Sequence, residues 1–339
     1  ACPGYLLCGD TPEWFVGAID SYSAGSGGAI TTYSMDMTLA LGESINRTWE
    51  SWPGQYPATS TSPPYHHEAS RDWKDYVNFP YWEPYAVYNF AGYSVTYRRY
   101  ANGTIDIEPD FAQSGWEAAV ESSSNIATMS EDGMMPQLHV ASVGAPAEVV
   151  FKVVTPFYLT SGTFSGSFVK TVSSDLNRIS VSTNGTAWTT VWENGLTGVT
   201  PVAGQSLGAS IKGAAQFWIK VTLQATGAIT DAGVNDLAIN LIFEHNKGAM
   251  AYLDKGVNNI TVTFDNPQDM VGSGAAMYVR YTWKEYDGSD WTIAREHDEQ
   301  ITNSPYTFQI VNGGTKVPRT ESIVMEVLPA RPGFAGPAS

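Results

Sequence analysis

Charged residues are scarce in this chain, and most of those present are acidic. Only 15% of the 339 residues are charged, 34 acidic against 18 basic, which gives a formal net charge of −16. Proteins that bind nucleic acid need Lys and Arg to neutralise phosphate groups, so this balance excludes nucleic acid as a partner. Helical bundles are rich in Glu, Lys and Arg, so the low charge also disfavours an all-helical fold.

Long apolar runs and cysteines are also rare. No stretch of about 18 apolar residues occurs, so no membrane span is predicted. There is no basic and apolar leader, which fits a mature chain whose signal was removed or a fragment of a longer protein. Cys2 and Cys8 are the two cysteines, and a small disulfide loop is their natural pairing, with two free thiols as the alternative. Their spacing lacks a second ligand pair, so it predicts no metal site.

Glycine and aromatic residues are plentiful instead. The chain has 32 Gly, 11 Trp, 18 Tyr and 13 Phe residues. Together with the low charge, this composition favours β-sandwiches whose faces are polar but uncharged. A length of 339 residues exceeds one ordinary core, so two or three domains are expected.

The clearest strand pattern lies in residues 147–194. Residues 149–154 alternate in the period of a strand, and a second run alternates Phe164 and Phe168 with small polar residues. A third run meets a fourth across Asn184-Gly185, a dipeptide that supplies the positive φ angles of a two-residue hairpin turn. The pattern predicts an all-β protein.

Similar alternation and turn signals divide the rest of the chain. The predicted fold is a series of antiparallel β-sandwich domains, jelly-roll or immunoglobulin-like, that follow an extended N-terminal arm. Strands are expected at residues 33–49 with a turn at Gly42, and in a hairpin across Asn102-Gly103. The expected units are an arm at 1–30, a β-rich domain at 31–145, a sandwich at 146–247, an immunoglobulin-like sandwich at 248–330 and a Pro/Gly tail at 331–339.

Several segments carry a family resemblance. ITVTF, MYVRYTW and VSTNGTAWTTVWE resemble tandem β-sandwich domains of large secreted bacterial proteins, planctomycete-like ones especially, and MTLALGESINRTW and ANGTIDIEPDF are similar to segments that precede such sandwiches. The resemblance covers about residues 30 to 328. It implies secretion and an array of β domains, and it carries over no catalytic residue.

The central hairpin is also similar to the Asp-box of sialidase-type propellers. The string from Ser182 to Trp188 is one residue shorter than that motif, has Asn in place of Asp and occurs once. Because a propeller repeats the motif, we do not expect that fold.

Motifs for catalysis and cofactor binding are missing. Neither a Gly-x-Ser-x-Gly elbow nor a nucleotide-binding glycine loop occurs, and Ser167-x-x-Lys170 falls on a predicted strand rather than at a helix start. His66-His67-Glu68 with Asp72 is interpreted as a solvated loop rather than a metal site, and residues 296–299 as an exposed acidic turn with calcium as the minor alternative. We therefore predict no enzyme, no cofactor and no metal.

Residues 51–85 form a long segment dense in proline and aromatics. Its side chains could stack on sugar rings, or they could pack the loop on its own sheet or on another subunit. The candidates for a sugar or interface contact are Trp52, Tyr65, Trp73, Tyr81 and Trp82.

Four Asn-x-Ser/Thr sequons mark possible glycosylation sites of a secreted protein. They are Asn46, Asn102, Asn184 and Asn259. Turn formation is the alternative explanation for Asn102 and Asn184.

The N-terminal arm suggests self-assembly. Its apolar run contains Trp14, Phe15, Val16 and Ile19 and precedes a Gly/Ser-rich hinge, as strand donation to a neighbouring subunit requires. The leading hypothesis is an extracellular, non-enzymatic structural protein that forms a fibre or surface layer with copies of itself. An adhesive module that binds glycans is the alternative, and an extracellular enzyme acting on polysaccharides is the third.

Overall fold

The computed structural model describes eleven segments of the chain. They are residues 32–33, 39–50, 100–155, 157–214, 216–246, 253, 255–262, 274–286, 291–301, 303–312 and 316–330. These segments are nearly all strand, which confirms the all-β class. The few helices are single turns: η4 (Trp116–Ala119), α2 (Met129–Asp132) and η5 (Ala209–Ile211). Within the described segments, no helix is long and apolar enough to cross a membrane.

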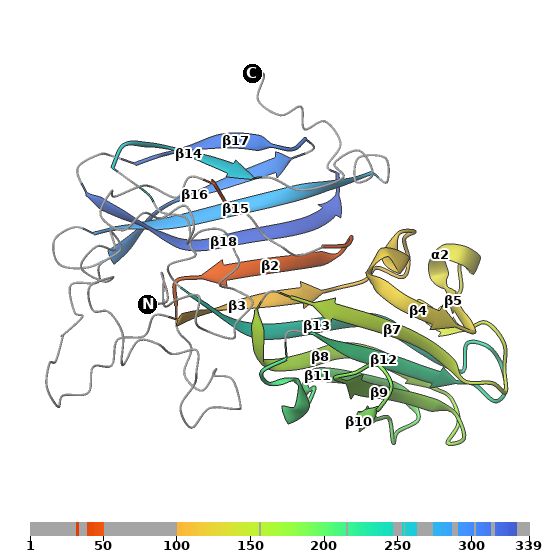
Figure 1. The fold of residues 1–339 in the computed structure, drawn as a ribbon. Helices are drawn as coiled ribbons and strands as arrows, with labels where there is room; N and C mark the ends of the chain where they lie inside the picture. Colours follow the sequence, from red (N-terminus) through yellow and green to blue (C-terminus); the bar gives the residue numbers. More distant parts are fainter. Residues whose placement is uncertain are drawn as a thin grey trace, which may run out of the picture.

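A ten-stranded sheet runs through the whole molecule (Figure 1). All neighbouring strands in it are antiparallel, and β2 and β3 lie near its middle. Its order is β11 (Gly198–Ser206), β8 (Tyr158–Lys170), β13 (Ala232–Asn246), β3 (Tyr100–Ile107), β2 (Glu43–Thr48), β18 (Val317–Pro329), β15 (Ala275–Tyr286) and β16 (Trp291–Ile301), with β5 (Ile126–Thr128) and β6 (Leu138–Val140) attached at β13.

Two smaller sheets pack on this long sheet, one near each end (Figure 1). The five-stranded sheet has the order β10 (Thr189–Glu193), β9 (Leu176–Ser182), β12 (Gln216–Gln224), β7 (Ala147–Val154) and β4 (Val120–Ser124). The three-stranded sheet has the order β1 (Thr32–Tyr33), β14 (Val257–Val262) and β17 (Tyr306–Val311). The molecule is thus two β-sandwiches that share one continuous sheet.

Aromatic contacts show how the layers meet. In the first sandwich, the Trp192 ring on β10 lies 4.5 Å from the Phe168 ring on β8, between centroids. In the second, the Phe308 ring on β17 lies 6.4 Å from the Tyr281 ring on β15. Alternate residues of each strand supply the core, as period-two patterning requires.

The junction between the sandwiches depends on Gly103. A Cβ atom there would lie 2.3 Å from the Asn46 carbonyl oxygen and 2.3 Å from Cζ of Phe243. Both Asn102 and Gly103 lie inside β3, so the expectation of a hairpin turn at these residues is wrong. The glycine serves close approach of neighbouring strands rather than a positive φ angle.

Candidate functional site: the outer face of the five-stranded sheet

The five-stranded sheet has an outer face that points away from the core. On β12, Phe217, Ile219, Val221 and Leu223 are fully buried against the long sheet, so the residues between them face outward. Strand register places outward side chains of β7 and β9 on either side of β12. The outer face, as we define it, carries Glu148, Lys152, Arg178, Ser180, Ser182, Trp188, Glu193, Trp218, Lys220 and Thr222, together with Glu121 at its margin.

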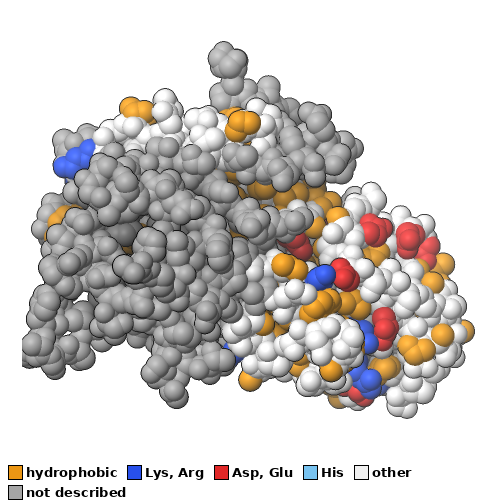
Figure 2. Space-filling view, viewed as in Figure 1, with side chains coloured by type: hydrophobic (Ala, Val, Ile, Leu, Met, Phe, Trp, Pro, Cys, Tyr) orange, Lys and Arg blue, Asp and Glu red, His pale blue; other side chains and the backbone are white. Residues whose placement is uncertain are grey.

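Figure 2 shows the surface on this side of the molecule. At the lower right, over the five-stranded sheet, hydrophobic side chains alternate with Lys or Arg and with Asp or Glu. The face therefore combines apolar surface with closely spaced charges of both signs.

Trp188 and Lys220 form the centre of the outer face. Nζ of Lys220 lies 4.4 Å from the centroid of the Trp188 ring, within the range of a cation–π contact. The same ammonium lies 3.0 Å from Oε1 of Glu148 on β7. These two contacts leave the Lys220 side chain only 16% exposed. Trp188 itself is half-exposed, so part of its indole ring is in contact with solvent.

A stapled turn holds Trp188 in this position. β9 and β10 form a hairpin, which confirms the predicted pairing, but residues 183–188 separate the strands rather than two residues. Oδ1 of Asn184 accepts hydrogen bonds from the backbone N–H of Thr186 (2.9 Å) and of Ala187 (2.8 Å), and Oγ of Ser182 accepts one from the N–H of Gly185 (2.9 Å). Only Gly185 in this turn has a positive φ angle, of 73°. The Asn184 side chain therefore acts as the turn staple, through Asx-type bonds to the backbone that follows it.

Trp218 lies beside this turn. A Cβ atom on Gly185 would lie 3.3 Å from Cε2 of the Trp218 ring, so the turn packs against the indole. Nζ of Lys152 lies 5.6 Å from the centroid of the same ring and 3.3 Å from Oε1 of Glu121. Each tryptophan of the outer face thus has one lysine near its ring, and each lysine has one carboxylate.

The remaining cation of the outer face is paired in the same way. Nη2 of Arg178 lies 2.7 Å from Oε2 of Glu193, its direct neighbour across the β9–β10 ladder. Hydroxyl side chains lie between these charged pairs. Among them, Oγ of Ser180 lies 3.4 Å from Oγ1 of Thr190. The arrangement offers aromatic rings for stacking and polar groups of both kinds for hydrogen bonds.

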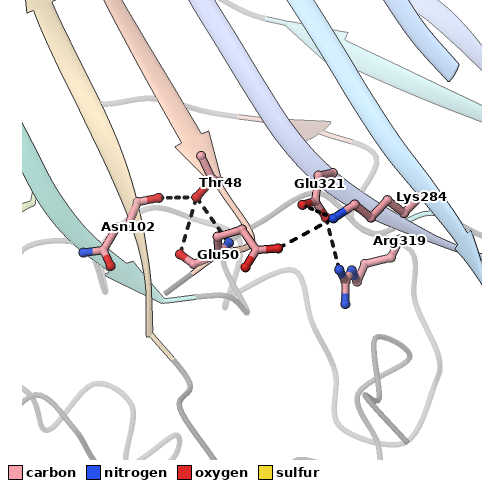
Figure 3. A network of polar contacts seen from close by, with 6 residues as sticks. All are labelled: Thr48, Glu50, Asn102, Lys284, Arg319 and Glu321. Atoms are coloured by element: carbon pink, nitrogen blue, oxygen red, sulfur yellow. Dashed lines mark hydrogen bonds and ion pairs between the residues drawn. The ribbon is translucent and has the colours of Figure 1, made fainter. Parts of the chain in front are cut away.

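A second polar cluster lies at the seam of the long sheet (Figure 3). Glu321 accepts hydrogen bonds from Nζ of Lys284 (2.6 Å) and Nη2 of Arg319 (3.1 Å), and Glu50 lies 3.6 Å from Nζ of Lys284. The Arg319 guanidinium also lies over the Trp49 ring, at 5.2 Å from its centroid. Oppositely charged groups on β15, β18 and the end of β2 thus join these strands, which is a structural role.

A third cluster lies between the edge strands β16 and β17. Glu299 bonds to Nε2 of His297 at 2.8 Å and accepts a hydrogen bond from the Tyr306 hydroxyl at 2.9 Å. Burial and the bond to Glu299 raise the pKa of Tyr306 to about 12, so this phenol stays protonated at neutral pH. The His297 ring stacks on Phe308 at 4.8 Å between centroids. We assign the cluster to joining the two sheets of the second sandwich.

The expected acidic turn at residues 296–299 is wrong, because these residues lie within β16. The charged side chains alternate on an edge strand, where Arg280 of β15 pairs with Glu296 at 3.0 Å and with Asp298 at 3.1 Å. The four consecutive ionisable residues 296–299 are therefore explained by an edge strand that has one face in solvent. In the part of the chain that the structure describes, no group of three or more His, Cys, Asp or Glu residues could hold a metal ion.

Most of the site residues predicted from sequence lie outside the described residues. This applies to Cys2 and Cys8, to the arm residues Trp14, Phe15, Val16 and Ile19, to the aromatic candidates Trp52, Tyr65, Trp73, Tyr81 and Trp82, and to His66, His67, Glu68 and Asp72.

The four sequons lie in the described part. Asn102 is fully buried, and its Nδ2 donates to the carbonyl of Phe243 at 3.1 Å, which leaves no room for a glycan on the folded chain. Asn46 is partly buried on β2, whereas Asn184 and Asn259 are exposed. Glycosylation of the two exposed residues stays a prediction.

Sequence reasoning missed Trp188 and Trp218 as candidate ligand contacts. The signal was present on β12, because inward Phe217 and Ile219 require Trp218 to face outward. No comparable signal marked Trp188, which is placed by the side-chain bonds of a turn.

Comparisons with known proteins assign neither a family nor an activity to this chain. No protein-family model matches the chain, and no curated protein matches it. Among solved structures, a Paenibacillus xanthan lyase aligns with 61% of this chain at 9% identity and a TM-score of 0.21. The match spans 25% of the lyase chain, and a likeness at this score supports neither a shared activity nor a shared substrate. The β-sandwich architecture implied by the family resemblance is present, while the secreted bacterial origin stays a prediction.

Proposed function

We propose that the chain is an extracellular, non-enzymatic module that binds carbohydrate on the outer face of its five-stranded sheet. The observation that carries the proposal is the half-exposed Trp188 ring, fixed from below by Lys220 and from the side by a stapled turn. A pyranose ring presents an apolar C–H face and a rim of hydroxyl groups. An indole ring beside the Lys220 ammonium, on a face that also carries carboxylates and hydroxyls, matches both features.

Preorganisation supports this proposal. Lys220 and the hydrogen bonds of Asn184 and Ser182 restrict Trp188 before any ligand arrives, so binding would cost little side-chain entropy. The central strands β9, β12 and β7 pair in a regular antiparallel register, which gives a rigid support.

Three of the described sheet edges, β11, β10 and β4, are poorly suited to accept a strand donated by another subunit. β11 carries Pro201 and a register shift after Val202, and β10 and β4 also have irregular registers. Proline, bulges and charges are the features by which natural edge strands avoid pairing with other chains. Self-assembly through the arm of residues 1–28 stays a prediction, tested by deleting those residues and looking for polymers by electron microscopy.

A Trp188→Ala variant tests the carbohydrate proposal. Binding of the full chain to a panel of immobilised polysaccharides should weaken by about tenfold or more, because the stacking surface is lost. Trp188→Phe keeps an aromatic ring and should retain most of the affinity. Val257→Ala, which changes an exposed residue of the second sandwich, is the matched control. Equal binding by Trp188→Ala and Val257→Ala would refute the proposed site.

A further inference from the structure

From the pairing of its charges, we infer that the outer face recognises neutral rather than acidic polysaccharides. The inference rests on the proposed carbohydrate function and names the class of ligand. Three cations and three carboxylates share the face, and they form three separate pairs. These are Lys220 with Glu148 at 3.0 Å, Lys152 with Glu121 at 3.3 Å and Arg178 with Glu193 at 2.7 Å.

A ligand carboxylate would have to compete with these pairs. Sites that recognise anions offer cations with donors directed at the ligand. Here Lys220 lies between the Trp188 ring and Glu148 and is mostly covered, so its ammonium is already occupied on two sides. A uronate that binds there would meet an ammonium whose charge is already balanced by Glu148, and its own negative charge would lie beside that carboxylate.

The net charge of the whole chain also disfavours acidic polysaccharides. A formal net charge of −16 repels polyanions over distances of about a Debye length, roughly 10 Å at 0.1 M salt. A neutral polymer meets no such barrier, and its hydroxyl groups can donate to the carboxylates and accept from the ammonium groups without breaking the pairs.

Binding assays with the full chain separate these cases. The probes are neutral β-glucan, xylan and galactomannan against polygalacturonate, alginate and xanthan, each at 20 mM and 300 mM salt. At least one neutral polymer should bind about tenfold or more tightly than every acidic one at low salt, with little dependence on salt and with loss of binding in Trp188→Ala. Tighter binding of an acidic polymer that Trp188→Ala abolishes would overturn the inference and leave the proposed function standing. If no polymer binds, the proposed function itself fails.

A charge variant tests the pairing argument directly. Glu148→Gln removes the carboxylate that neutralises Lys220. The unbalanced positive charge of Lys220 should then raise the affinity for polygalacturonate about three- to fivefold at low salt. Glu326→Gln removes one negative charge from β18, in the other sandwich, and is the matched control. Equal affinity of both variants for polygalacturonate would contradict the inference that Glu148 neutralises the charge of Lys220.

Discussion

Replacing Gly103 with alanine should destabilise the whole protein. Gly103 lies on β3, between β2 and β13, where the two sandwiches join. The new methyl group would lie 2.3 Å from a backbone oxygen of β2 and 2.3 Å from the Phe243 ring, whereas an ordinary contact is 3.4 Å or longer. Phe243 cannot move freely, because it stacks on Phe157 at 4.4 Å between centroids.

The size of the effect follows from overpacking. One methyl forced into a packed core costs about 1–3 kcal/mol, and here part of the resistance comes from sheet backbone, so we expect a loss of about 3 kcal/mol or more. Gly195→Ala is the matched control, since a Cβ there meets nothing within 4 Å. Both variants lose the same glycine entropy in the unfolded chain, so the difference between them isolates the clash.

Urea unfolding followed by tryptophan fluorescence measures this difference. The Gly103→Ala midpoint should fall well below that of Gly195→Ala with a similar slope. Free energies of unfolding within about 0.5 kcal/mol of each other would refute the continuous sheet at β2, β3 and β13.

Two further predictions concern the turn and a partly buried carboxyl group. Asn184→Ala removes the acceptor of the turn staple and should lower the free energy of unfolding by about 1–2 kcal/mol, while Asn184→Asp, which keeps the acceptor, should lose less, as thermal unfolding would show. Equal losses would argue against the staple. Burial raises the pKa of Glu43 to about 6, against the opposing effect of its bond from the Ala40 N–H. Because the pKa is higher in the folded state, the stabilising contribution of Glu43 is complete below pH 4.5 and is lost as the pH rises through 6. Glu43→Gln should therefore gain up to about 2 kcal/mol over the natural protein between pH 4.5 and pH 8 in urea unfolding, and parallel pH profiles would contradict the assignment.

The sequence was most informative where alternation was regular. The runs at β7, β8, β9 and β12 read directly as strands, because alternate residues there face a common core. The hairpin of β9 and β10 was also predictable from Asn184-Gly185.

Other features depended on contacts between distant segments. Asn102-Gly103 has the residues of a turn but lies in a strand, because the neighbouring Phe243 and β2 backbone need the space that glycine leaves. Residues 296–299 look like a solvated turn because an edge strand can carry charge on its outer face. The sharing of one sheet by two sandwiches follows from the pairing of β2 with β18 and β3, about 275 and 60 residues away along the chain, which no local pattern records.

The candidate site was only partly predictable. From the sequence, the aromatic side chains of residues 51–85 could stack on sugar rings or pack against the protein or another subunit, and these residues lie outside the described part of the chain. The proposed site on the outer face contains Trp188 and Trp218, whose positions depend on a turn staple and on lysines from neighbouring strands.

The indole N–H resonances of the 11 tryptophans, followed by NMR during titration with a neutral oligosaccharide, test the central claim most directly. The Trp188 and Trp218 signals, assigned by single substitutions to Phe, should shift progressively while those of the buried Trp116 and Trp283 stay fixed. Shifts confined to Trp52, Trp73 or Trp82, with Trp188 and Trp218 unmoved, would place the ligand elsewhere and contradict the account.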